Sequence, residues 1–156
     1  MDLTGEERIN APRQAVWNAM NDVEMLKPCI PGCETLERLS DTDIQAAIRV
    51  NLGIIKIRFH GLLILSNLNP PFSYTISGEG QGSVAGFATG SADVELIEES
   101  PDVTLLRYTI NGDAGGKIAQ LGTKLLGNAA RKIADRFFAS IGEEAAKSVH
   151  QDSSIL

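Results

Sequence analysis

Residues 116–147 read GKIAQLGTKLLGNAARKIADRFFASIGEEAAK, and the rest of the fold can be worked out from this segment. Apolar side chains recur there at every fourth position in two neighbouring rows, and residues four apart lie one above the other on a helix. The first row is Leu121, Leu125, Ala129, Ile133, Phe137, Ile141 and Ala145, and the second is Ile118, Gly122, Leu126, Ala130, Ala134 and Phe138. The rows predict one helix from about Gly116 to Lys147, about 45 Å long, whose apolar stripe must cover a large apolar surface.

The residues before this helix alternate between apolar and polar side chains, which is the period of strands with one buried face. Turn residues such as Asn69-Pro70-Pro71 separate the strands at short intervals, so an antiparallel meander is predicted. The positions predicted to face the helix are Ile48, Val50, Ile55, Ile57, Phe59, Tyr74, Ile76, Val94, Leu96, Leu106, Tyr108 and Ile110.

The chain is predicted to begin with a strand over residues 3–9, followed by two short helices. Asn10-Ala11-Pro12 is typical of a helix start, and this helix is expected to reach Met20. The second is expected over residues 23–27, before Pro28. The whole order predicts an α+β protein with the helix-grip fold, a curved antiparallel sheet of about seven strands around a long C-terminal helix. We expect a single domain over residues 1–148 and a polar tail over residues 149–156.

Composition narrows the classes of function. The 156 residues carry a net charge of -6, and aromatic residues are 5%, which argues against a nucleic-acid partner. The sequence has no apolar run near the roughly 20 residues of a membrane helix and no signal-peptide pattern at its start. We therefore expect a cytoplasmic protein.

Glycines recur between residues 78 and 90. The segment Gly78-Glu79-Gly80-Gln81-Gly82 imitates a dinucleotide-binding fingerprint, but that motif needs a following helix and here more strand follows. The glycines that share the inward-facing parity are Gly78, Gly80, Gly86 and Gly90. Their missing side chains allow sharp bending or leave room for a ligand, although bulky neighbours could fill the same room.

Residues suited to catalysis or metal binding are scarce. Cys29 and Cys33 flank a tight turn, whereas a structural zinc site usually takes four Cys or His ligands. His60 is expected on the polar side of a strand and His150 in the tail, so neither is placed to serve as a general base. We predict no catalytic residue, no metal site and no cofactor.

Basic side chains gather on the long predicted helix of this acidic chain. They are Lys117, Lys124, Arg131, Lys132 and Arg136. Such a face is most often solvated. The alternatives are contact with an acidic partner, or peripheral contact with anionic lipid headgroups at the inner face of the membrane.

Three stretches carry a resemblance to a known family. They are Cys29-Ile30-Pro31-Gly32-Cys33-Glu34, the glycine-rich region from Gly78 to Gly90, and Gly115-Gly116-Lys117-Ile118-Ala119-Gln120-Leu121-Gly122. Together they resemble the carbon monoxide dehydrogenase G-subunit family, within the START-like (SRPBCC) superfamily. The resemblance implies a non-catalytic accessory of a carbon monoxide dehydrogenase-type molybdenum hydroxylase, acting in membrane attachment, maturation or quinone handling. START-like proteins hold apolar molecules between sheet and helix.

The leading hypothesis is therefore the binding of a quinone or a lipid in a cavity between sheet and helix. The residues expected to line this cavity are Trp17, Ile55, Ile57, Phe59, Tyr74, Ile76, Gly78, Gly90, Val94, Tyr108, Leu121, Leu125 and Phe137. Two alternatives remain open, an interaction protein with a filled core and a START-like cyclase or hydrolase acting on an apolar substrate.

Overall fold

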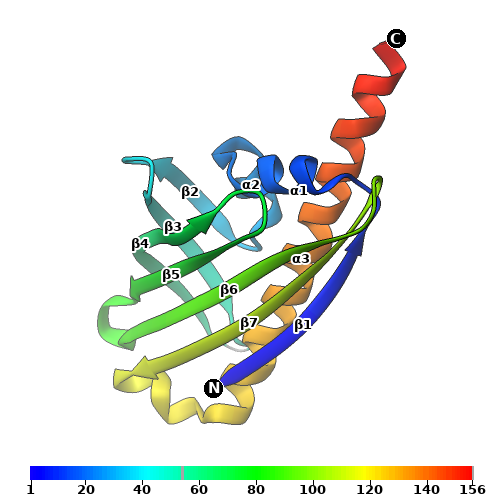
Figure 1. Cartoon of the computed structure of the whole chain (residues 1–156). Helices are drawn as coiled ribbons and strands as arrows, with labels where there is room; N and C mark the ends of the chain where they lie inside the picture. The colour runs from blue at the N-terminus through cyan, green and yellow to red at the C-terminus, as the bar shows by residue number, and fades with distance from the viewer. Residues whose placement is uncertain (54, 156) are drawn as a thin grey trace.

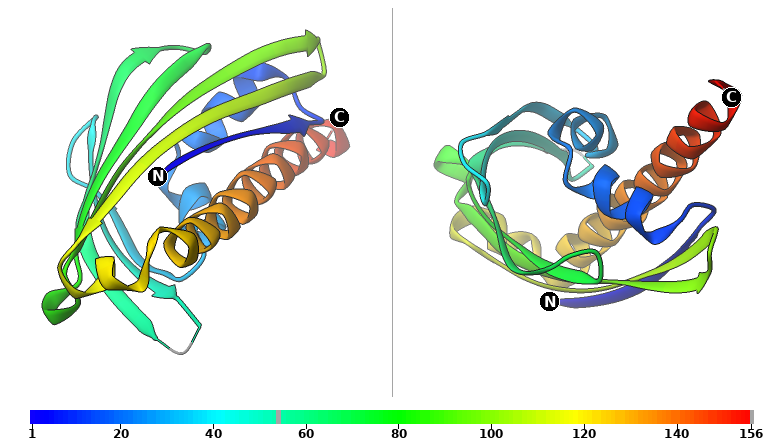
Figure 2. Two further views of the ribbon diagram at one scale, coloured as in Figure 1. Left: turned by 90° about the horizontal axis from the view of Figure 1, so that it is seen from below. Right: turned by 45° about the horizontal axis from the view of Figure 1, so that its top comes forward.

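The computed structural model describes residues 1–53 and 55–155. Its elements are β1 (Asp2–Ile9), α1 (Arg13–Met20), α2 (Val23–Cys29), β2 (Cys33–Arg38), β3 (Asp43–Asn51), β4 (Lys56–Asn69), β5 (Ser73–Gln81), the 3₁₀ turn η1 (Ser83–Ala85), β6 (Phe87–Ser100), β7 (Val103–Gly115), the 3₁₀ turn η2 (Gly116–Leu121) and α3 (Thr123–Ile155). Within these residues, seven strands form one antiparallel sheet in the order β1-β7-β6-β5-β4-β3-β2. The sheet curves around α3, while α1 and α2 close one end (Figure 1; Figure 2). The predicted helix-grip fold is confirmed.

The sheet has the register that the alternation predicts. Tyr74 pairs with Val94, which pairs with Tyr108, and all three are buried. On the opposite face, Arg107 of β7 forms an exposed ion pair with Glu6 of the neighbouring β1, and Arg58 of β4 reaches Glu34 on β2, two strands away. The predicted inner face is therefore correct along the strands.

Ile55 is the exception to the predicted inner face. It lies between β3 and β4, one position before β4 begins at Lys56, and its side chain is 38% exposed. Alternation constrains a side chain only while the backbone is paired as a strand, so it does not hold in this turn.

The long helix begins and ends later than predicted. Residues 116–121 form η2, and Gly122 has a φ of 90°, which an α-helix cannot continue through. The helix therefore starts at Thr123, and it continues past Lys147 to Ile155 because no Gly or Pro interrupts the sequence there. The second short helix also extends further, since Pro28 lies in its last turn and Cys29 ends it. None of the described helices has both the length and the hydropathy to span a bilayer.

Tyr108 packs α3 against the sheet where β7 pairs with β1. Its ring stacks on Phe138 with centroids 4.2 Å apart. Its hydroxyl donates to Asp135 Oδ1 at 3.2 Å and accepts from Arg131 Nη1 at 3.3 Å. The ring lies across Gly5, its partner on β1, and a Cβ at that position would collide with the phenol.

Gly5→Ala is therefore expected to displace the Tyr108 ring and to lower the free energy of unfolding by about 1–3 kcal/mol, as overpacking usually does. Gly127→Ala is the matched control, because its Cβ would meet only Met1 at ordinary distance and alanine favours a helix. Urea unfolding measures both variants. Equal unfolding midpoints would contradict this packing.

Candidate functional site

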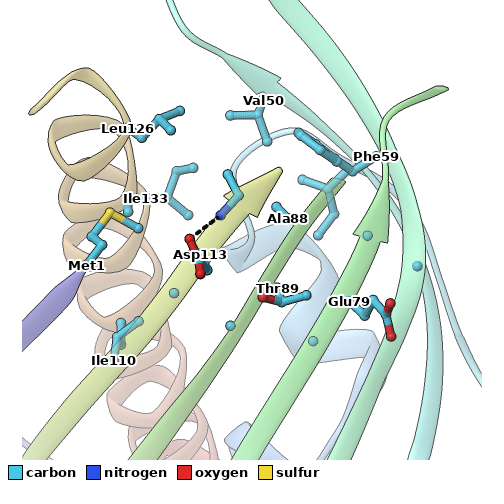
Figure 3. A pocket seen from close by; sticks show the side chains of 18 of the residues that line it. Met1, Val50, Phe59, Glu79, Ala88, Thr89, Ile110, Asp113, Leu126 and Ile133 are labelled. Atoms are coloured by element: carbon cyan, nitrogen blue, oxygen red, sulfur yellow. Dashed lines mark hydrogen bonds between the residues drawn. The ribbon is translucent and has the colours of Figure 1, made fainter. Parts of the chain in front are cut away.

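A cavity of about 620 Å³ lies between the sheet and the first half of α3 (Figure 3). Its helix wall is made by Leu126, Ala129, Ala130 and Ile133. Val50 and Phe59 lie across from this wall on β3 and β4. The size is that of a typical small-molecule site.

A row of glycines forms the sheet side of the cavity. Gly78 on β5 pairs with Gly90 on β6, and Gly90 pairs with Gly112 on β7. None of the three has a positive φ, so the backbone does not require glycine at these positions. A Cβ on Gly90 would meet only backbone of β7, the Asn111 carbonyl oxygen at 3.3 Å and Gly112 Cα at 3.9 Å. The missing side chains are therefore the reason that the space stays open.

The side chains of α3 that face these glycines are small as well. Ala129 and Ala130 line the cavity from α3, and Ala88 and Ala92 line it from β6. Leucine or isoleucine at any of these positions would reach into the space. Small residues on both walls therefore produce the cavity.

The other half of the interior, next to α1 and α2, is filled by aromatic side chains. Trp17 meets Tyr74 edge-on with ring centroids 5.2 Å apart, and Phe137 meets Phe138 edge-on at 5.0 Å. Burial raises the pKa of Tyr74, so its hydroxyl stays protonated. That hydroxyl has no hydrogen-bond partner among the described residues. The interior thus consists of a packed half and a hollow half.

A small apolar cluster lies at the end of the hollow half that is away from α1 and α2. Leu52, Ile57 and Ile118 form its buried centre, and we call these three residues the plug. Leu52 and Ile118 also line the cavity. The plug joins the turn between β3 and β4 to η2.

The residues predicted to line the cavity are distributed over these regions. Phe59, Ile76, Gly78 and Gly90 line the cavity. Trp17, Tyr74, Val94, Tyr108 and Phe137 belong to the packed half. Ile57 lies in the plug and Leu121 packs against it, while Ile55 and Leu125 are 38% and 40% exposed. Period identifies the face of an element, but not where along its length the sheet and the helix separate.

Several lining residues were not among those predicted. They include Met1, Ile30, Ala46, Leu63, Leu126, Ala129, Ala130 and Ile133. The second row of the helix pattern already contained Leu126 and Ala130, and the pairing of small residues on helix and sheet was a further usable signal. Met1 and Ile30 had no such signal, because both come from segments outside the strand pattern.

The polar residues of β5, β6 and β7 beside the cavity turn their side chains away from it. Glu79, Thr89 and Asp113 alternate with inward-facing residues, pair with one another across β5, β6 and β7, and are exposed. Their side chains therefore fall on the convex face. Among the described residues, no three His, Cys, Asp or Glu side chains lie close enough together to hold a metal ion.

The two cysteines are free; Cys29 is the last residue of α2 and Cys33 is the first residue of β2. Cys29 is buried, and its Sγ donates to the Met25 carbonyl oxygen at 3.2 Å. Burial, with smaller contributions from Glu144 and Glu143, raises the pKa of the Cys29 thiol from 9.0 to about 11. Burial also raises the pKa of Cys33.

At about pH 8, Cys29 in the folded protein is expected to react with iodoacetamide more slowly than in urea, because the thiolate is the nucleophile. The folded protein disfavours the thiolate, so its stability is at its full value below pH 9.0, the ordinary pKa, where the thiol is protonated both folded and unfolded. That part of the stability is lost as the pH rises toward about 11, the pKa in the folded protein. Trypsin leaves Cys29 and Cys33 on one peptide, so fragmentation mass spectrometry of that peptide assigns the label to each thiol and measures its rate, with the more exposed Cys33 as internal comparison. Equal rates at Cys29 in folded and unfolded protein would show that the thiol is not held in this environment.

Comparisons with known proteins place the chain among relatives of the same shape. The model of the CoxG family, the G-subunit of carbon monoxide dehydrogenase, matches residues 5–146. A conserved protein from Geobacillus kaustophilus superposes with a TM-score of 0.88 at 27% identity, covering 95% of this chain and 97% of its own. None of the curated proteins compared with the chain matches it.

More distant structures share the fold. A START superfamily protein from Mycobacterium smegmatis has a TM-score of 0.73 at 10% identity, covering 94% of this chain and 97% of its own. The ZhuI aromatase/cyclase from Streptomyces sp. R1128 has a TM-score of 0.70 at 14% identity, covering 96% and 95%. These likenesses establish a START-like fold.

Proposed function

The chain belongs to the CoxG family of carbon monoxide dehydrogenase, and on that basis we propose that it binds one apolar molecule in the cavity under α3. The ligand class we favour is a quinone or a lipid. The protein acts without catalysis, in the cytoplasm, as an accessory of a molybdenum hydroxylase of the carbon monoxide dehydrogenase type.

The observation that carries the proposal is the row of glycines on the sheet opposite the small side chains of α3. Empty apolar space destabilises a protein, by about 24 cal/mol for each Å³ in measured cases. Water gains little there, because it needs two to four polar partners and the lining of the cavity is mostly apolar. An apolar ligand supplies the missing contacts and explains why small residues are present on both walls.

The arrangement of polar groups favours binding over catalysis. A reaction needs an acid, a base or a nucleophile within reach of the bound molecule. Glu79 and Asp113 belong to the convex face, and the thiols of Cys29 and Cys33 are held protonated by burial. The cavity therefore does not offer the acid, base or nucleophile that a cyclase-type reaction would need.

Displacement of a fluorescent apolar probe tests the ligand class. The delipidated protein is first saturated with an anilinonaphthalene dye, and a short-chain quinone or a lysophospholipid is then titrated in. The proposal expects displacement by one of them at a stoichiometry of one per chain. Failure of the dye to bind, or of both ligands to displace it, contradicts the proposal.

The accessory role is tested by affinity purification from the native host. A tagged chain is expected to copurify with subunits of a molybdenum hydroxylase, identified by peptide mass spectrometry and molybdenum content. A chain that binds an apolar ligand but never copurifies with such an enzyme would contradict only the accessory role.

A further inference from the structure

The hydroxyl of Tyr74 is an exception among the polar groups of the interior. Tyr74 is 2% exposed, and its hydroxyl has no hydrogen-bond partner among the residues that the structure describes. No other buried side-chain nitrogen or oxygen atom of those residues lacks a partner. Buried hydroxyls are nearly always hydrogen-bonded, because a hydroxyl that loses its hydration and gains no partner destabilises the fold.

The packing around Tyr74 does not require a hydroxyl. The ring meets Trp17 edge-on, with centroids 5.2 Å apart, and belongs to the main apolar cluster. A phenylalanine would make the same ring contacts without burying an unpaired polar atom. The hydroxyl therefore lowers the stability of the fold, and residues that break a local rule in this way are most often found at functional sites.

Tyr108, the other tyrosine of the chain, has the usual arrangement. Both tyrosines pair with Val94 across the sheet, so they belong to one row of inward side chains. The Tyr108 hydroxyl donates to Asp135 Oδ1 at 3.2 Å and accepts from Arg131 Nη1 at 3.3 Å. The fold thus provides partners for the tyrosine beside α3 and none for the tyrosine on β5, the central strand of the sheet.

Tyr74 lies next to the inner end of the cavity, although it does not line the cavity itself. The neighbouring row of inward side chains does line it, and this row consists of Ile76, Ala92 and Ile110. All three also pack against the buried cluster that contains Tyr74. Ala92 is the diagonal neighbour of Tyr74 on the adjacent strand, a separation that an aromatic side chain can bridge. Because Ala92 has the smallest side chain of its row, it leaves the shortest way from the cavity to Tyr74.

The chemistry of the hydroxyl defines the ligand atom that fits it. Burial raises the pKa of Tyr74, so the hydroxyl stays protonated and offers a hydrogen-bond donor. The complementary group is an uncharged oxygen acceptor such as a carbonyl, since a carboxylate or phosphate would lose its hydration in this apolar interior.

We propose that Tyr74 donates a hydrogen bond to an uncharged oxygen atom of the bound ligand. The ligand oxygen approaches over Ala92, and the Tyr74 ring tilts toward the cavity to meet it. The rest of the ligand then extends from this inner end toward the plug. This inference rests on the proposed function and deepens it, because it gives the ligand an orientation and requires one neutral acceptor on an otherwise apolar molecule.

Two probes of nearly the same shape, 2-acetylnaphthalene and 2-ethylnaphthalene, test the hydrogen bond. Only the ketone carries an acceptor, and each probe is titrated into extracted protein that holds an anilinonaphthalene dye. Tyr74→Phe is expected to weaken ketone binding by about threefold to tenfold, the usual effect of one hydrogen bond, and to leave hydrocarbon binding within about twofold. In the unaltered protein the carbonyl stretch of the bound ketone is expected at lower wavenumber than in Tyr74→Phe.

Stability gives the second readout. Tyr74→Phe is expected to raise the melting temperature of the ligand-free protein by roughly 2–5 °C, because it removes an unpaired buried hydroxyl. Tyr108→Phe is the matched control, since the same change there takes a hydroxyl away from Asp135 and Arg131. This control is expected to lower the melting temperature and to keep the ratio of ketone to hydrocarbon affinity unchanged.

The outcomes separate this inference from the proposed function. Equal effects of Tyr74→Phe on the two probes would show that Tyr74 only packs, and a lower melting temperature would show that its hydroxyl has a partner within the fold. Either result overturns the inference while leaving ligand binding in place. If neither probe displaces the dye from the unaltered protein, the proposed function fails and this inference fails with it.

Discussion

Phe138→Ala is expected to lower the free energy of unfolding by about 3–5 kcal/mol, the usual cost of truncating a buried phenylalanine. Phe138 is 3% exposed and lies between the stacked Tyr108 ring and the edge-on Phe137 ring. Truncation removes both ring contacts and leaves an empty space, because the curved sheet and the long helix cannot move close enough to fill it. For a domain of this size the melting temperature should fall by about 10 °C or more.

Lys132→Ala is the control for this prediction. Lys132 is exposed on the same helix, where a substitution usually changes stability by less than about 0.5 kcal/mol. Urea unfolding with circular dichroism measures both variants. Similar midpoint shifts for the two would mean that α3 does not pack on the sheet through Phe138.

Gly90→Leu is expected to abolish ligand binding while leaving the fold intact. A leucine at this position projects into the cavity, where the nearest obstacles to its Cβ are backbone atoms of β7 and not side chains of α3. It therefore occupies the space that the ligand needs. Because the new side chain finds room, we expect stability to hold within about 1 kcal/mol or to rise, unlike the loss that overpacking causes in a full core.

Gly90→Ala and Gly78→Ala control for the backbone cost of replacing a glycine in a strand, since alanine adds little volume. Gly78→Leu repeats the test on the neighbouring strand, where the new Cβ would meet only the Leu63 Cδ2 atom at 3.0 Å, a flexible end that can move. Thermal melting and ligand retention are measured together. Early melting of both leucine variants, with stable alanine controls, would show that the interior is already full.

The sequence predicts the faces of the fold well. Alternation identifies the inward residues of every long strand, because one buried face forces a period of two. The fourfold spacing on α3 likewise identifies Ala134, Phe138, Ile141 and Ala145, all of them buried. These predictions depend on local periodicity, which can be read directly from the amino-acid sequence.

The boundaries of the cavity could not be predicted in this way. Tyr74 and Ile76 have the same parity on β5, yet Tyr74 belongs to the packed half and Ile76 lines the cavity. The difference arises because the distance between α3 and the sheet varies along the helix, a tertiary property with no periodic signal. Leu125 fits the helix pattern but is 40% exposed, whereas the adjacent Leu126 lines the cavity, so the inward side of α3 at this point excludes Leu125.

Native mass spectrometry of the chain purified from its own host asks whether the cavity holds a ligand. We predict one apolar adduct per chain in the unaltered protein, removed by organic extraction and missing in Gly90→Leu. An unaltered protein that carries only the mass of its polypeptide, together with a Gly90→Leu variant that melts well below Gly90→Ala, would contradict ligand binding in the cavity.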